Sequence, residues 1–193
     1  MSHLTTDDLM SLEQYARVRP DFRQKVLDHK KDRKVHLGPN ATLYFESRLT
    51  MQYQIQEMLR VERIFEPEGI ADELGAYNPL IPDGTNWKAT FMLEFPEVAE
   101  RKRELAQLVG VEDKVWVQVE GHDKAYAIAD EDLERETEEK TSSVHFMRFE
   151  LDSGMIDALK SGAQLTIGCD HPRLSEEITV SDAVRKSLIG DLD

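Results

Sequence analysis

Hydrophobic residues recur with a helical period in the first part of the chain and with a period of two in the second part. The first part predicts helices over residues 6–18 and 20–31, with Pro20 at the start of the second helix, where a missing backbone N–H costs little. Residues 34–46 hold the turn sequence GPN between two apolar stretches, which predicts a short hairpin or an extended arm. The hairpin leads into a predicted central helix over residues 46–65.

The second part alternates in the way that half-buried strands do. In the segment 87–95, Trp87, Phe91 and Phe95 share one face. Alternation with intervening helices predicts an α+β fold: an antiparallel sheet with segregated helices and an N-terminal helical arm. Further strands are predicted over 115–121, 124–129, 143–151, 163–171 and 177–181, and further helices over 68–76, 96–109, 153–162 and 182–189.

The length of 193 residues suits one domain. The predicted organisation is a single domain over 1–193, in which 1–33 form the helical arm, 34–86 the central helix and its loop, and 87–193 the antiparallel sheet with its helices. The composition of the N-terminal arm allows domain swapping or dimerisation, so a homodimer is an open alternative.

The central helix has an unusual distribution of polar residues. On a helical wheel, Gln52, Gln56 and Arg63 cluster in one sector, which predicts the solvent face, and apolar residues occupy nearly all of the rest. A helix that is apolar around its circumference is usually largely buried. The second polar set, opposite the predicted solvent face, consists of Thr50, Gln54 and Glu57, and Glu62 also lies among apolar positions.

A buried carboxylate is costly unless it is paired, hydrogen-bonded or bound to a metal, so Glu57 and Glu62 each require a partner. One interpretation is a structural ion pair with an arginine from elsewhere in the fold. The other is a functional site in which Glu57 is the catalytic acid or base, tuned by Tyr53 and Arg60. The same spacing also fits an ordinary pair on a helix surface.

Two histidines fall on core-facing strand positions and extend the functional interpretation. His145 and His171 share faces with apolar neighbours, and imidazole with carboxylate is the ligand set for iron, manganese or zinc. The predicted metal ligands are Glu46, Glu57, His145 and His171, with Gln54 nearby. The alternative for each histidine is a hydrogen-bonded structural role, because no HxH, HxxxH or ExxH spacing is present. The missing ExxH pair also argues against a ferritin-type diiron bundle.

Composition narrows the classes of function. A net charge of −14 disfavours binding to nucleic acid and to anionic membranes. No apolar run approaches the length of a membrane span and the N-terminus lacks signal-peptide features, so the cytoplasm is the expected location. The lone cysteine, Cys169, is expected to be a buried small hydrophobe. The acidic segment 130–140 is expected to be solvated, with a docking surface for a basic partner as the alternative.

Four segments carry a resemblance to a known family: FESRLTMQYQIQEMLRVERI, AYNPLIP, FELDSGMIDALKSGAQLTIGCDHP and RKSLIGDL. Together they resemble the bacterial family named domain of unknown function 3501, over nearly the whole chain. The resemblance implies a cytoplasmic domain whose gene often lies near those of a rubrerythrin-like protein and an iron–sulfur or flavin oxidoreductase. It therefore implies an accessory or partner protein in a redox or oxidative-stress system. The alternative is a metal-dependent enzyme or metal-binding protein with a buried Glu/His site.

Overall fold

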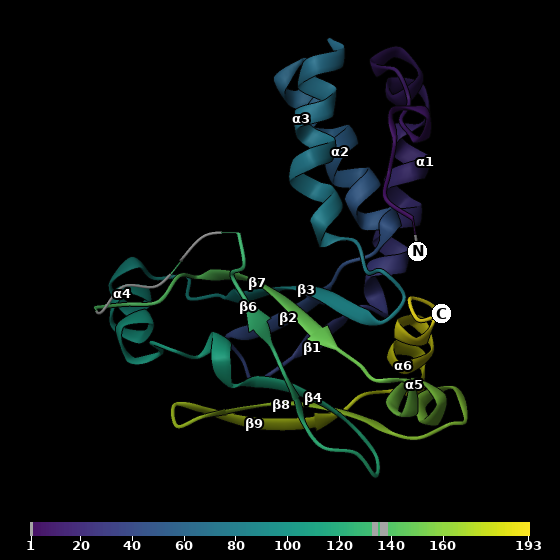
Figure 1. Cartoon of the computed structure of the whole chain (residues 1–193). Coiled ribbons are helices and arrows are strands. Elements are labelled where there is room, and N and C mark those ends of the chain that lie inside the picture. Colours follow the sequence, from purple (N-terminus) through teal and green to yellow (C-terminus); the bar gives the residue numbers. More distant parts are fainter. Residues whose placement is uncertain (1, 133–134, 136–138) are drawn as a thin grey trace.

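The computed structural model describes residues 2–132, 135 and 139–193, and it confirms an α+β fold with antiparallel sheets. The acidic segment 130–140 therefore lies partly outside the described residues. Figure 1 shows three helices that project from a body of strands, with α4 at one end of the body and α5 and α6 at the other. The helices are η1 (Thr6–Asp8), α1 (Leu12–Lys31), α2 (Arg48–Glu62), α3 (Pro67–Tyr77), η2 (Asn78–Leu80), α4 (Val98–Gln107), η3 (Glu112–Lys114), α5 (Ser153–Lys160) and α6 (Asp182–Ile189).

The strands form two antiparallel sheets, of which one has the order β1-β2-β3-β7-β6 and the other the order β5-β4-β8-β9. The short strands β5 and β6 follow each other in the chain but belong to different sheets, so this segment joins the sheets along one edge. The strands are β1 (Lys34–His36), β2 (Ala41–Phe45), β3 (Asn86–Leu93), β4 (Val115–Val119), β5 (Ala125–Tyr126), β6 (Ile128–Ala129), β7 (Val144–Glu150), β8 (Leu165–His171) and β9 (Leu174–Thr179).

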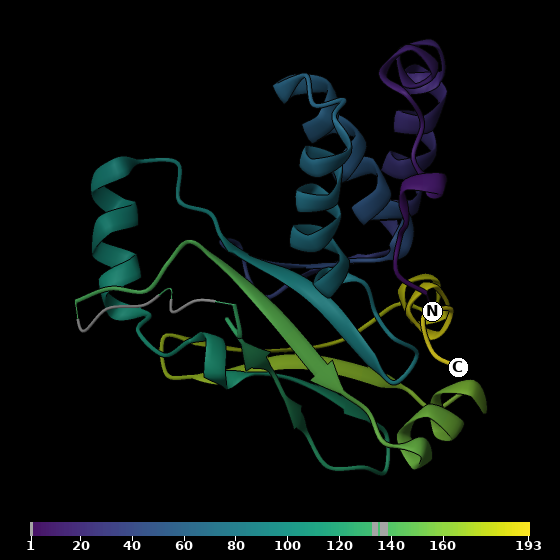
Figure 2. The same cartoon turned by 45° about the horizontal axis from the view of Figure 1, so that its top comes forward.

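The period-two alternation places the main core between the sheets. Trp87 and Phe91 of β3 and Phe149 of β7 are fully buried, and they belong to one cluster with residues of β4 and β8 such as Val117 and Ile167. Most outward positions of β3 and β7, such as Lys88, Thr90 and Phe146, are only half-buried, which fits side chains that point to opposite faces of a strand. The two sheets in Figure 2 therefore enclose an apolar layer. The apolar residues of this layer come from the alternate positions of each strand that face the other sheet.

Helix α2 packs against both α1 and α3, and the three helices form the helical projection. The prediction of two N-terminal helices, over 6–18 and 20–31, is wrong. Only a short 3-10 turn forms over 6–8, and α1 then runs unbroken through Pro20. Proline removes one helical hydrogen bond, but packing against α2 holds this helix together, with Tyr15 and Val26 on its buried side. Among the described residues, no helix combines the length and the apolar character that a membrane span requires.

Helix α2 corrects the predicted orientation of the central helix. Gln56, which was assigned to the solvent face, is fully buried, and its side-chain amide bonds both the N–H and the carbonyl of Met10. Glu62 is exposed and does not need the predicted partner, and Phe65 beyond the helix is 71% exposed. The helical wheel gave a wrong prediction here because η1 and the residues that lead from it into α1 cover a polar side of α2. Their backbone groups satisfy its glutamines, as when the side-chain amide of Gln52 donates to the carbonyl of Asp8.

Candidate functional site

Glu57 meets an arginine. Its Oε1 accepts from Arg19 Nε at 2.7 Å and from Tyr15 Oη at 2.6 Å, and its Oε2 accepts from Arg19 Nη2 at 2.9 Å. The hydrogen bonds from Arg19 are the largest cause that lowers the pKa of Glu57, to about 2. Burial and the hydrogen bond to Glu57 raise the pKa of Tyr15. This arrangement is a bidentate ion pair that fastens α1 to α2.

Of the residues that were predicted to act with Glu57, Arg60 contacts its carboxylate, whereas Tyr53 packs against another aromatic ring. Arg60 Nη2 donates to Glu57 Oε2 at 3.2 Å, in the (i, i+3) relation. Tyr53 packs its ring against Phe22, with 6.2 Å between the ring centroids, and Gln54 is half-buried on the same helix. A catalytic role for Glu57, Arg60 and Tyr53 remains a prediction. A carboxylate held by two arginines and a tyrosine has little basicity left for proton transfer.

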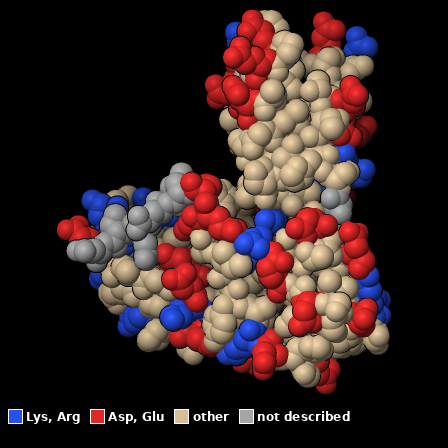
Figure 3. Space-filling view, in the orientation of Figure 1, with Lys and Arg blue, Asp and Glu red and all other residues tan. Residues whose placement is uncertain are grey.

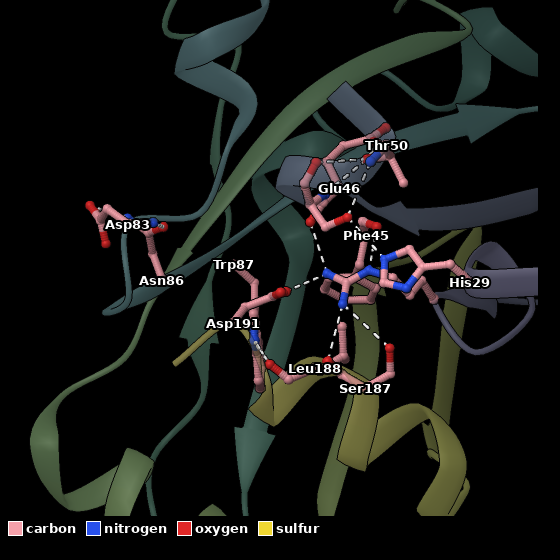
Figure 4. A network of polar contacts seen from close by, with 12 residues as sticks. His29, Phe45, Glu46, Thr50, Asp83, Asn86, Trp87, Ser187, Leu188 and Asp191 are labelled. Carbon is pink, nitrogen blue, oxygen red and sulfur yellow. Dashed lines mark hydrogen bonds and ion pairs between the residues drawn. The ribbon is translucent and has the colours of Figure 1, made fainter. Parts of the chain in front are cut away.

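Glu46 lies at the end of β2 and is also satisfied within the fold. Its carboxylate accepts from Thr50 Oγ1 at 2.6 Å and from Thr90 Oγ1 at 2.8 Å, and the side chain is 8% exposed. The carbonyl of Glu46 accepts from Arg33 Nη2, whose guanidinium also pairs with the buried Asp191 (Figure 4). Glu46 thus belongs to a network that ties the end of β2 to the start of α2 and to the C-terminal region.

His171 ends β8 and has a structural environment. Its Nε2 lies 3.3 Å from the carbonyl of Val109, and its Nδ1 accepts from the N–H of Arg173 at 3.2 Å. Both ring nitrogens are therefore used by backbone groups. In the described part of the chain, Glu46, Glu57 and His171 take part in no group of three or more metal-ligating side chains, so the predicted four-residue metal set is not assembled.

His145 does belong to such a group, but with two carboxylates that the sequence analysis did not select. Glu112 of η3, Asp130 and His145 of β7 bring their ligand atoms within 4.8 Å of one another. His145 is fully buried and Glu112 is 5% exposed. We refer to these three residues as the Glu–Asp–His cluster.

Backbone geometry places Asp130 in the cluster. Strand β6 pairs with β7 so that Ala129 lies opposite Met147, and Asp130 follows with its N–H bonded to the carbonyl of Phe146 at 2.8 Å. Asp130 has φ of 51°, a left-handed conformation that aspartate adopts more readily than most residues. Its side chain turns back onto β7, where Oδ1 accepts from the N–H of Phe146 at 3.0 Å and Oδ2 lies 2.6 Å from His145 Nδ1.

Acceptors surround both nitrogens of the His145 ring. Nε2 lies 3.1 Å from the carbonyl of Ser142 and 2.9 Å from Thr141 Oγ1, and the Thr141 hydroxyl donates its hydrogen to Glu112 Oε2 at 3.2 Å. Oxygen atoms of Asp130, Thr141 and Ser142 thus contact the two ring nitrogens of His145.

An oxygen-rich pocket around one imidazole nitrogen can also hold a metal ion. Glu112 Oε2 lies 3.9 Å from His145 Nε2, a spacing that two ligands at about 2.0–2.2 Å from one ion can span. Asp130 at Nδ1 would orient the ring, as carboxylates beside metal-bound histidines do. Arg135 lies 3.0 Å from Asp130 Oδ1 and offsets part of the negative charge.

Sequence reasoning found His145 through its core-facing position but missed Glu112 and Asp130. Glu112 is 33 residues before His145 in the chain and Asp130 is 15 residues before it, as their numbers show, so no short motif joins them. Only the β6–β7 register and the 3-10 turn before β4 bring them together. Because the segment 130–140 is rich in acidic residues, the sequence analysis expected Asp130 to be solvated.

The fold and the cluster define a small mixed α+β protein with two antiparallel sheets, a helical projection and a buried ionisable cluster. The chain belongs to the family described as protein of unknown function (DUF3501), whose model matches residues 3–192, so the resemblance is confirmed. It is similar to the crystal structure of a novel protein of unknown function from Burkholderia pseudomallei K96243. The two are 50% identical, with a TM-score of 0.94 and coverage of 100% of each chain. A comparison with curated proteins gave no match.

Proposed function

We propose that this protein binds one divalent first-row metal ion, of which manganese, iron and zinc are the candidates, at the Glu–Asp–His cluster. The observation that supports this is the convergence of two carboxylates and one imidazole within 4.8 Å in the buried interior. Mixed carboxylate and imidazole ligands suit these metals. The proposal keeps His145 from the predicted ligand set and replaces Glu46, Glu57 and His171 by residues that the fold brings to it.

Each residue of the cluster has a distinct proposed role. His145 Nε2 and Glu112 Oε2 are the ligands, because they face the same space with the Thr141 hydroxyl between them. Asp130 is a positioning residue, because it contacts the opposite nitrogen of the ring.

Metal analysis tests this proposal directly. Protein purified without a histidine tag and reconstituted with Mn²⁺, Fe²⁺ or Zn²⁺ is expected to retain about one equivalent of one of them after desalting. Glu112→Gln is expected to retain less than about a tenth of an equivalent, because it loses a charged ligand. Asp130→Asn keeps a residue that tolerates the left-handed backbone, and it is expected to weaken binding about 10–100-fold.

The matched control is Glu46→Gln, which neutralises another buried carboxylate outside the cluster. Its metal content is expected to equal that of the unmodified protein. Circular dichroism spectra and unfolding midpoints of all variants separate lost ligands from lost folding. The proposal is refuted if the folded, unmodified protein retains no metal, or if Glu112→Gln and Glu46→Gln retain equal amounts.

A second proposed function is that of an accessory protein to a redox partner, a rubrerythrin-like or an iron–sulfur or flavin oxidoreductase. The observation that favours it is an apolar groove of about 490 Å³ at the far end of the helical projection, which includes Leu9, Leu12, Ile64 and Phe65. Exposed carboxylates, including Glu62 and Glu66, border this end, where Figure 3 shows red atoms beside tan ones. Such a surface fits an apolar anchor on a basic partner.

Binding to a purified rubrerythrin-like protein tests this second function. Phe65→Ser is expected to weaken the complex at least about tenfold, because it removes the most exposed aromatic side chain of the groove. The matched control is Val98→Ser on α4, which removes another exposed apolar side chain, 56% exposed, from a different part of the surface. Equal binding by Phe65→Ser and the unmodified protein, or no binding to any of the named partner classes, would count against this role.

A further inference from the structure

A cleft of about 670 Å³ separates the base of the helical projection from the outer face of the larger sheet. Tyr77, Pro79 and Leu80 line it on the projection side, and Lys88 and Phe146 belong to the sheet side. Its volume lies in the range of small-molecule binding sites. Figure 3 shows blue basic atoms in the hollow at the base of the projection, with red acidic atoms around them.

Two cations lie side by side on the sheet face of this cleft. Lys88 of β3 is directly opposite Arg148 of β7 in the antiparallel register, and both side chains line the cleft. Like charges in directly opposite positions destabilise a sheet unless other groups compensate for them. The arrangement therefore requires counter-charges.

Arg148 is hydrogen-bonded to its counter-charges, whereas Glu131, Asp83 and Glu150 act on the charge of Lys88 only through space. Arg148 donates to both carboxylate oxygens of Glu131, at 2.9 and 2.7 Å, and also pairs with Glu150. No hydrogen bond or ion pair within the described part of the chain engages the amine of Lys88, which is half-buried. Burial is the largest cause that lowers the pKa of Lys88, followed by the charge of Arg148. The cleft thus holds an amine whose charge is only partly balanced.

We propose that this cleft binds a small carboxylate with an apolar body, whose carboxylate pairs with the amine of Lys88. Phe146 and the apolar side chains of the projection would cover the apolar body. Glu131 and Glu150 occupy Arg148, so specificity for the negative charge rests on Lys88.

The proposed metal ligands lie outside this cleft, because His145 faces the core and the cleft lies on the outward face of β7, with Phe146 and Arg148. Arg135 connects the two regions, since it lies over the Phe146 ring and pairs with Asp130.

Titration of the full-length protein with benzoate, followed by calorimetry and by ligand-observed NMR, tests this proposal. Saturable binding is expected for benzoate, and binding at least about tenfold weaker for benzamide, which has the same shape without the charge. Lys88→Met is expected to weaken benzoate binding at least about tenfold, whereas Lys88→Arg keeps the positive charge and is expected to stay within about threefold of the unmodified protein.

The matched control is Lys186→Met, which removes the same charge from an exposed position on α6 outside the cleft. It is expected to bind benzoate as the unmodified protein does. Three outcomes would overturn the proposal: no saturable binding of benzoate, equal binding of benzoate and benzamide, or equal weakening by Lys88→Met and Lys186→Met. If the first of these outcomes is accompanied by binding of inorganic phosphate, the cleft is a site for a different anion.

Discussion

Replacement of Arg33 by methionine is expected to lower the free energy of unfolding by about 3–5 kcal/mol, the cost of breaking a buried ion pair from one side. The Arg33 guanidinium is 2% exposed and pairs with Asp191, which is 4% exposed. It also donates to the carbonyls of Phe45 at 3.0 Å, Glu46 at 2.8 Å and Ser187 at 3.1 Å. Methionine fills most of the volume but leaves Asp191 and three carbonyls without their donor.

Asp191 explains why the loss is large. Burial raises the pKa of the Asp191 carboxyl, and the charge and hydrogen bond of Arg33 act against that rise. Without Arg33 the carboxyl must either protonate or stay charged without a partner, and both states cost stability. Urea unfolding at constant pH measures the difference between the proteins.

The double variant Arg33→Met with Asp191→Leu separates the ion pair from the packing. It is expected to recover part of the loss, because it removes the unpaired charge together with its partner. If Arg33→Met lowers the free energy of unfolding by less than about 1 kcal/mol, the Arg33–Asp191 pair is not a major source of stability, because solvent-exposed ion pairs contribute that much.

The second large effect is expected from Glu57→Gln, which should lower the free energy of unfolding by about 2 kcal/mol at neutral pH. A pKa lowered from 4.5 to about 2 corresponds to about 3 kcal/mol of linked stability. The smaller figure allows for solvent screening, because the side chain of Arg19 is 33% exposed and that of Glu57 is 18% exposed.

The effect of Glu57→Gln has a defined dependence on pH. The carboxylate of Glu57 has a lowered pKa in the folded state, so its contribution is complete above about pH 4.5 and disappears as the pH falls towards 2. The difference in unfolding free energy between the two proteins is therefore expected to shrink over this interval. Thermal unfolding at a series of pH values measures it, and a difference that stays constant from pH 7 to pH 3 would contradict the assignment.

Tyr15→Phe is the matched control for Glu57→Gln. It removes one hydrogen bond to Glu57 and leaves the Arg19 pair intact, so a smaller loss of about 1 kcal/mol is expected. Both variants should retain metal in the amounts found for the unmodified protein, because neither residue contacts the Glu–Asp–His cluster. A loss of metal in Glu57→Gln would instead favour the functional interpretation of the polar face of α2.

Much of the fold could be predicted because strand alternation is a local signal. The period-two pattern from Trp87 onward gave the strands and their buried faces, and the GPN turn gave the hairpin of β1 and β2. The N-terminal helices were divided wrongly because Pro20 suggests a boundary that packing overrides. The wheel of the central helix misplaced Gln56 because the backbone that satisfies it comes from residue Met10, far away in the chain.

The candidate site was predicted only in part. The burial of His145 followed from its position on an alternating strand, and the need of Glu57 for a partner followed from the cost of a buried charge. Glu112 and Asp130 carried no local signal, because one lies in a 3-10 turn and the other follows a two-residue strand. Lys88 was also missed, since its environment depends on the cross-strand neighbour Arg148 and on a helix from another part of the chain.

The sequence by itself determined the α+β class, the faces of the strands and the presence of ionisable groups that require partners. These properties follow from periodicity and from the free energy of transferring charge out of water, both of which act residue by residue. The tertiary structure alone decided which partner each group has: Arg19 for Glu57, Asp191 for Arg33, and Glu112 with Asp130 for His145. Those choices depend on strand register and helix packing, which set distances between residues far apart in the chain.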